Sequence, residues 1–334
     1  MHDRQWREQA RRICGVQVSP AIHRRVSIAA LIALSVIIVT GAAVRLTNSG
    51  LGCDDWPNCN SEKLIDVSSA HAAIEQLNRL FTGVVALAVI AAVLVSYVRA
   101  PRRRDLIALS WFLVAGVVAN ALLGAVTVWV DLHPYAVQGH LLLSLVLIAA
   151  GVVLVRRAGE PDGAPRQPRV AVADRVLVWG VALGTTLAVV TGTVVTGAGP
   201  HAGDENAVRL DVSIPTVARL HGASVIATII VALVLARRVI IMPESRVLSA
   251  GVSRWVFVAL LQAVLGYTQY LTGVPEILVG LHVAGATAVS AAAAALVLDA
   301  SAPRPQKLGG SGGIVETGAT TGIESSPNVT PTSQ

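Results

Sequence analysis

Long apolar runs separated by short polar connections dominate the sequence. They cover about 26–46, 72–98, 106–130, 136–155, 175–197, 215–236, 252–272 and 276–299. Each run reaches the length of about 20 residues that a helix needs to cross the hydrocarbon core of a membrane. Backbone groups in lipid must satisfy their hydrogen bonds within the segment, so each run should be an α-helix. The pattern predicts an all-α membrane protein with eight transmembrane helices.

The composition agrees with a chain that meets lipid rather than water. Hydrophobic residues make up 54% and charged residues only 14%, whereas about a quarter of the residues in a soluble domain are charged. Arginines gather before the first run, after the second, and in the fourth-to-fifth and sixth-to-seventh connections, while the other connections are acidic. This positive-inside pattern predicts that both termini are cytoplasmic. The net charge of +6 therefore reports topology and not a nucleic-acid partner. Arginine far outnumbers lysine, as in GC-rich bacterial genomes, so we expect a bacterial plasma membrane.

The polar segments divide the chain into five parts. Residues 1–25 are read as a basic cytoplasmic leader, and residues 158–174 as a cytoplasmic linker rich in Pro, Gly and Arg. The linker separates an N-terminal four-helix half, 26–157, from a C-terminal four-helix half, 175–299. Residues 300–334 are rich in Ser, Thr, Gly and Pro, which predicts a disordered cytoplasmic tail.

The two halves carry corresponding short motifs in the same order; we call these motifs the marks of the repeat. The marks are Val39-Thr40-Gly41, Asn78, Asn120-Ala-Leu-Leu-Gly124 and His140 in the first half, and Val190-Thr191-Gly192, His221, Gln262-Ala-Val-Leu-Gly266 and His282 in the second. Each half begins on the same side of the membrane after four crossings, so the repeats are parallel. The sequence predicts two pseudo-symmetric four-helix bundles.

Three histidines, His140, His221 and His282, lie inside apolar runs. Each is a few residues from the outward end of its run, or roughly 6–10 Å deep at 1.5 Å per residue. A polar side chain at that depth is first interpreted as functional. The alternative is a structural histidine that is hydrogen-bonded between helices. Because His221 and His282 lie at equal depth in one half, we interpret them as the two ligands of a haem iron.

The N-terminal half lacks this second histidine. Asn78 corresponds to His221, and asparagine is a poor iron ligand, so His140 would leave an iron there with one open face. Glu75, one helical turn from Asn78, would border that open site and suit proton transfer or stabilisation of a developing cation. The alternative role of Glu75 is an ion pair with an arginine, Arg79 or Arg45.

Further polar side chains lie near the outward ends of the runs. Arg45, Arg79 and Arg219 run against the positive-inside bias and would suit haem propionates, or they extend to lipid phosphates. His71 would suit a propionate or a proton path, or it marks the membrane interface.

Two of the three cysteines, Cys53 and Cys59, share one outward loop. A disulfide can persist in that oxidising compartment. Two free thiols are the alternative, and a metal site is less favoured because no histidine accompanies the pair.

A resemblance to a known family rests on several of these residues together. Residues 41–59 read GAAVRLTNSGLGCDDWPNC, and Glu75, Asn78-Arg79 and the three intramembrane histidines follow in order. Over about residues 26–299 the chain resembles the haem A synthase family. The resemblance implies a duplicated four-helix fold in which His221 and His282 hold haem b. It implies that the N-terminal half binds the substrate haem O and oxidises its methyl group at ring position 8 to a formyl group, giving haem A for cytochrome c oxidase.

The resemblance also implies roles and partners. Glu75 matches an essential catalytic carboxylate. Cys53 and Cys59 match a pair that can form a disulfide and is proposed to assist transfer of haem O from haem O synthase. Water supplies the oxygen, and electrons leave to a membrane acceptor that the sequence does not identify. The expected partners are haem O, haem O synthase, that acceptor, the lipid bilayer and, as one option, further copies of the chain in a homo-oligomer.

Two departures from the family pattern affect the substrate site. The family usually has histidine where this chain has Asn78, and the second cysteine pair of some members is absent. We therefore expect His140 to be the sole protein ligand of the substrate iron from these two positions. The main alternative function is a membrane di-haem cytochrome that transfers electrons without catalysis. A small-molecule transporter would also fit the parallel repeats. Transporters of this kind have broken helices, however, and the sequence shows none.

Overall fold

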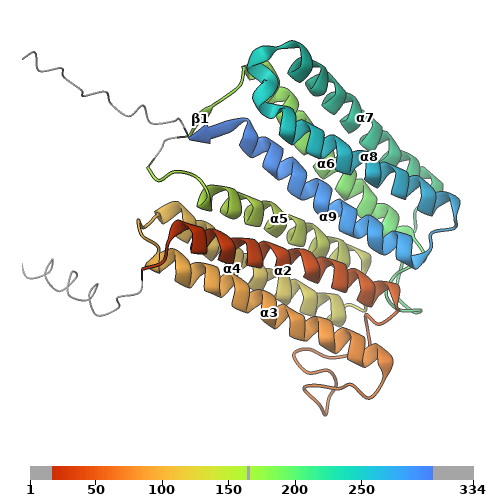
Figure 1. The fold of residues 1–334 in the computed structure, drawn as a ribbon. Helices are drawn as coiled ribbons and strands as arrows, with labels where there is room; N and C mark the ends of the chain where they lie inside the picture. Colours follow the sequence, from red (N-terminus) through yellow and green to blue (C-terminus); the bar gives the residue numbers. More distant parts are fainter. Residues whose placement is uncertain (1–16, 164–165, 304–334) are drawn as a thin grey trace, which may run out of the picture. The chain divides into compact units, whose positions relative to one another are not determined.

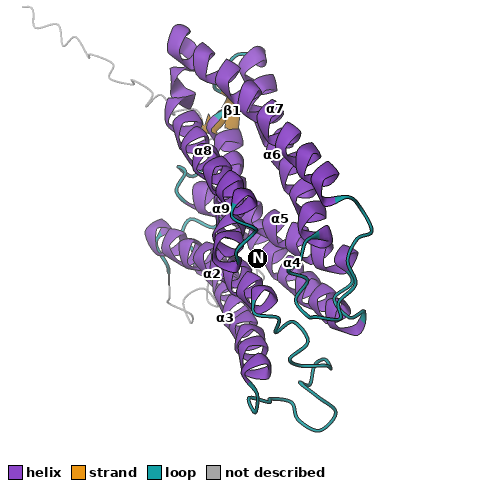
Figure 2. Ribbon diagram, turned by 90° about the vertical axis from the view of Figure 1, so that its right-hand side faces the viewer, coloured by secondary structure: helices purple, strands orange, loops and turns teal. Residues whose placement is uncertain are grey.

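The computed structural model describes residues 17–163 and 166–303, and this part of the chain is mostly helical (Figures 1 and 2). The long helices are α2 (Pro20–Leu46), α3 (Ala70–Val98), α4 (Arg104–Trp129), α5 (Pro134–Ala158), α6 (Val172–Ala198), α7 (Ile214–Ile241), α8 (Ser249–Leu271) and α9 (Glu276–Asp299). Within the described residues, eight helices are long and apolar enough to cross a membrane, α8 together with the preceding 3₁₀ turn η1 (Pro243–Leu248). The predicted fold class and helix number are confirmed.

The boundaries of the polar parts differ from those expected. Helix α2 begins at Pro20 because Ser19 caps it, accepting from the backbone N–H of Ile22, and because proline favours the first helical turn. Residues 20–25 therefore belong to the first helix and not to a leader. Residues 301–303, expected in the tail, form the short strand β2 (Ser301–Pro303), antiparallel to β1 (Arg166–Pro168) of the linker. The rest of the predicted leader and tail, 1–16 and 304–334, lies outside the described residues.

The helices pack as four successive antiparallel hairpins: α2–α3, α4–α5, α6–α7 and α8–α9. Helices α2 to α5 contact one another around an apolar core that includes Leu34, Leu113 and Ile148. Helices α6 to α9 do the same around Leu235 and Trp255. Helix α9 packs against α2 and α5, which joins the two sets (Figure 1). Pseudo-symmetry between the two sets stays a prediction.

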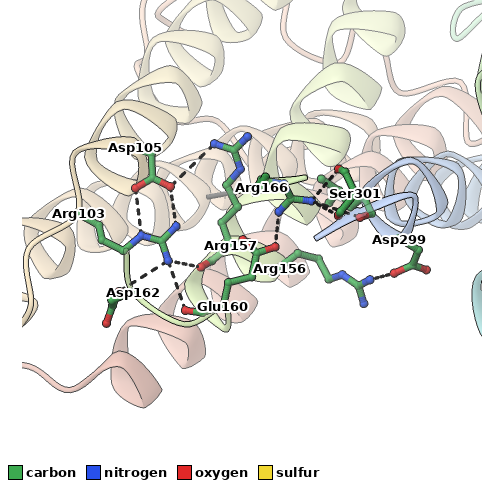
Figure 3. A network of polar contacts seen from close by, with 10 residues as sticks. Arg103, Asp105, Arg156, Arg157, Glu160, Asp162, Arg166, Asp299 and Ser301 are labelled. Atoms are coloured by element: carbon green, nitrogen blue, oxygen red, sulfur yellow. Dashed lines mark hydrogen bonds and ion pairs between the residues drawn. The ribbon is translucent and has the colours of Figure 1, made fainter. Parts of the chain in front are cut away.

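We call the end of the molecule at which α2, α4, α6 and α8 begin the linker end, and the opposite end the loop end. Arginine–carboxylate pairs hold the connections together at the linker end (Figure 3). Arg103 donates to Asp105 at 2.6 Å and lies 3.7 Å from Asp162. Hydrogen bonding to Asp105 raises the pKa of Arg103 above its usual range, so this guanidinium stays charged. Arg156 in the last turn of α5 pairs with Asp299 at the end of α9, which ties the two sets of helices together at this end.

Candidate functional site

The two histidines of the C-terminal half face each other at the loop end. His221 lies two turns into α7 and His282 nearly two turns into α9. Their ring centroids are 6.4 Å apart, with the ring planes at 79°. The rings therefore stand edge to face. A metal–imidazole bond is about 2 Å long. When one metal ion binds a nitrogen of each of two rings, two such bonds and the two distances from nitrogen to ring centre place the ring centroids about 6 Å apart.

The hydrogen bonds of His221 select which nitrogen is free. Its Nδ1 lies 2.9 Å from the carbonyl oxygen of Ala188 and 3.3 Å from the hydroxyl of Thr191. A ring that donates its Nδ1–H to a carbonyl keeps the lone pair on Nε2, the form that binds a metal. Nδ1 of His282 is buried without a hydrogen-bond partner in the described part of the chain. Two half-buried imidazoles at this spacing fit a haem iron, which takes its axial ligands from such pairs.

In the N-terminal half, Asn78 of α3 is held by a threonine of α2. The hydroxyl of Thr40 donates to Oδ1 of Asn78 at 2.8 Å. Thr40 and Thr191 occupy equivalent places in the repeat, so the same residue type supports Asn78 in one half and His221 in the other. His140 lies on α5, and no hydrogen bond joins it to Asn78 among the residues that the structure describes.

Glu75 is buried, and both of its oxygens accept hydrogen bonds. The backbone N–H of Cys53 donates to Oε2 at 2.8 Å. Arg79 donates to Oε1 through Nε at 3.0 Å and Nη2 at 2.6 Å. The ion pair named above as the alternative role of Glu75 is therefore present with Arg79, whereas Arg45 binds elsewhere.

Arg79 also fastens the loop that carries Cys53 and Cys59 to α3. Its Nη1 donates to the carbonyl oxygens of Asp55 and Asn58, at 2.8 and 3.0 Å. Cys53 and Cys59 form a disulfide, and both are buried. The disulfide confirms the first of the alternatives left open by the sequence. The guanidinium of Arg79 thus binds the loop backbone and Glu75 at once.

The remaining candidates bind different parts of the loop end. Arg45 donates to the carbonyl oxygens of His201 and Thr196, at 2.5 and 3.0 Å, and so joins α2 to the α6–α7 connection. His71 lies 2.9 Å from the hydroxyl of Ser49 through Nδ1. Arg219 is exposed on α7. Haem-propionate roles for these side chains stay predictions.

Sequence reasoning missed a buried polar cluster at the linker end. His23 is fully buried, and its Nε2 lies 2.8 Å from the hydroxyl of Ser96, which in turn lies 3.0 Å from that of Ser110. His23 falls just before the first apolar run and was therefore counted with the leader. The serines of α3 and α4 were the available signal, because two hydroxyls in adjacent apolar runs need partners.

The scaffold and the histidines together define a class: a multi-pass membrane protein that brings two histidine rings within 6.4 Å of each other on apolar helices. The chain belongs to the cytochrome oxidase assembly protein family, whose model matches residues 24–75 and 64–294.

Curated relatives similar to the chain include proteins named Heme A synthase. Those of Listeria monocytogenes serovar 1/2a and Lysinibacillus sphaericus are both 29% identical to it, over 174 and 137 residues. That of Exiguobacterium sibiricum is 29% identical over 163 residues. The alignments cover 51%, 41% and 48% of this chain, and 57%, 45% and 55% of the respective relatives. The chain spans about half the length of the curated relatives it matches.

Proposed function

We propose that this protein is a haem A synthase. It would oxidise the methyl group at ring position 8 of haem O to a formyl group, giving haem A for cytochrome c oxidase. The observation that carries the proposal is the family match, which extends over all four hairpins and includes each candidate ligand. The names of the curated relatives support the same activity.

In this proposal, His221 and His282 hold haem b. The 6.4 Å between the ring centroids would let both residues hold one iron, and the carbonyl of Ala188 would keep His221 in the tautomer that leaves Nε2 free. Haem b, when bound, accepts and passes on single electrons. The protein contributes two fixed, neutral donors and a water-poor setting between α7 and α9.

The N-terminal half would bind haem O through His140 alone. The oxygen of the Asn78 side chain already accepts a hydrogen bond from Thr40, and a carboxamide is a weak iron ligand. Asn78 would therefore leave open the face of haem O that is opposite His140. That face is where water could reach the substrate. Conversion of a methyl group and one water into a formyl group releases four protons and four electrons, so the site needs a proton acceptor and an exit for electrons.

Glu75 would serve as the proton acceptor. A carboxylate offers about four acceptor positions, and three donors from Cys53 and Arg79 use three of them. The backbone N–H of Gly52 also donates to this carboxylate, so a proton from the substrate side would replace one of these hydrogen bonds. Arg79 would act as a positioning residue, because it holds Glu75 and the disulfide loop in one arrangement.

The proposal includes an orientation and partners. The protein would lie in a bacterial plasma membrane with the linker end in the cytoplasm, since the arginine-rich connections lie at that end. The disulfide loop would then face outward and receive haem O from haem O synthase, while a membrane acceptor takes the electrons.

Haem extraction and chromatography from membranes of a haem-O-producing host, with and without the chain, test the activity. We expect haem A only when the chain is present, and none with His140→Ala. Bound haem b together with unconverted haem O, in the presence of a working electron acceptor, would replace the proposal with the electron-transfer cytochrome.

A further inference from the structure

Each of the four hairpins pairs a glycine on its first helix with a candidate ligand on its second. The pairs are Gly41 with Asn78, Gly124 with His140, Gly192 with His221 and Gly266 with His282. All four glycines are among the repeated marks of the sequence. The pairing therefore recurs at equivalent places in α2–α3, α4–α5, α6–α7 and α8–α9.

The contacts are tight for the three histidines. A methyl group added at Gly266 would lie 3.0 Å from Cε1 of His282, and one at Gly192 would lie 3.1 Å from Cε1 of His221. At Gly124 the distance to Cε1 of His140 would be 3.2 Å. Carbon atoms in ordinary contact are about 3.5–4.0 Å apart, so any side chain at these glycines would force the ring to move.

The contact at Gly41 is loose by comparison. A methyl group there would meet only Nδ2 of Asn78, at 4.0 Å. The hairpin that carries Asn78 thus has free space beside its glycine, whereas in the other three hairpins a histidine ring occupies that space.

Other helical glycines show that this is not general helix packing. A methyl group at Gly184, two turns from Gly192 on α6, would meet Thr228 at 2.4 Å and no histidine. At Gly222, next to His221, and at Gly83 it would meet nothing within 4 Å. Small residues often allow helices to approach closely, and Gly184 fits that role, whereas Gly124, Gly192 and Gly266 face imidazole rings.

We propose that Gly124, Gly192 and Gly266 are positioning residues that set the orientation of the three ligand rings. Cε1 is bonded to both ring nitrogens, so a surface pressed against Cε1 fixes the direction in which Nε2 points. Thr191 and Ala188 hold the Nδ1 side of His221, and Gly192 limits its Cε1 side. Gly41 offers the same kind of surface, but the side chain of Asn78 does not press against it. This inference rests on the proposed function, because it concerns the ligands of haem.

The test compares glycine-to-alanine variants of the full-length protein purified with its haem. Gly192→Ala and Gly266→Ala are the test variants. Gly222→Ala, in open space, and Gly184→Ala, at a packing contact on the same hairpin as Gly192, are the controls. The readouts are the ratio of haem b to protein, the rate of haem loss to an external acceptor protein, and the electron paramagnetic resonance signal of the oxidised haem, which reports ligand orientation.

We expect haem to be lost about tenfold faster from both test variants, at the low end of the effect of losing outer support around a metal ligand. Their resonance signal should shift, while Gly222→Ala matches the wild type. Gly184→Ala should lower thermal stability without shifting the signal. In the N-terminal half, Gly124→Ala should weaken haem O binding more than Gly41→Ala does.

Two results separate the inference from the function on which it rests. If the wild type holds haem and the test variants behave like Gly222→Ala, the inference is wrong and the proposed function stands. If the wild type takes up no haem, both fail. Should one test variant not accumulate in the membrane, the other, on a different hairpin, gives the same readout.

Discussion

The two halves of the molecule carry different residues at corresponding positions of their repeated sequence motifs. In α7, His221 is preceded three residues earlier by Ala218 and followed by Gly222. At the corresponding places in α3, around Asn78, stand Glu75 and Arg79. The same hairpin thus presents an imidazole with apolar neighbours in one half, and a carboxamide with an ion pair in the other.

Under the proposed function, this comparison shows how repeated sequence motifs would serve two tasks. The threonine and the glycine that support the ligand position are present in both halves, at Thr40-Gly41 and Thr191-Gly192. The residue at the ligand position differs, asparagine in one half and histidine in the other. A closed two-ligand site suits storage and passage of an electron, whereas an open site beside a carboxylate suits reaction at a substrate.

Removal of a C-terminal ligand should have the largest effect. His282→Ala leaves one imidazole where two are needed, so we expect nearly complete loss of haem b from the purified protein. His140→Ala, in the other half, is the matched control and should keep it. Absorbance spectra of the reduced protein measure both, and an H282A protein with its full haem b would break the assignment of the pair.

The next largest effect is expected from Glu75→Gln. Glutamine keeps the size and one oxygen but cannot accept a proton, so haem A formation should fall by about 100-fold or more, as when a general base is lost. Haem b content should not change, because Glu75 belongs to the other half. Arg79→Lys serves as a comparison, since it keeps the charge but not the several hydrogen bonds. Equal, small losses in both variants would favour a purely structural ion pair.

Asn78→His sharpens the comparison by making the halves alike. Gly41 leaves space for a ring, and Thr40 can bond its Nδ1 as Thr191 bonds that of His221. With haem O bound, we expect a second low-spin, two-imidazole signal in addition to that of haem b. Electron paramagnetic resonance detects it, and a spectrum unchanged from the wild type would mean that position 78 does not face the iron of haem O.

The smallest of these effects should come from opening the disulfide. Cys53→Ser with Cys59→Ser removes a constraint worth about 2 kcal/mol for so short a loop, while Arg79 still holds the loop through backbone carbonyls. Hydrogen exchange at the backbone N–H of residue 53, which donates to Glu75 in the wild type, should speed up, and haem A formation should fall only a few-fold. The side-chain oxygen of Gln76 lies 3.7 Å from the sulfur of Cys53, so Gln76→Leu is a control that changes the surroundings of the disulfide and leaves the bond intact. Unchanged exchange would mean that Arg79 alone fixes the loop.

Much of this architecture could be predicted because it depends on local patterns. Helix number follows from the length of apolar runs, and the equal depth of His221 and His282 follows from their place in the repeat. Arg79 and Arg45 could not be assigned in this way. Both bind backbone carbonyl groups of loops, and since every residue has such a group, nothing in the sequence marks the ones that accept. His23 escaped notice for a related reason, because the helix begins earlier than the apolar run does.

The even number of helices in each set has a consequence for how such a protein can arise by duplication and how its two sets could be produced. Helix α5 ends at the linker end, where α2 begins, and α9 returns to the same end and pairs with the linker through β1 and β2. A gene for four helices can therefore be joined to its own copy without turning the second copy over in the membrane. For the same reason, the two sets could be made as separate chains that insert in one orientation and meet along α5 and α9.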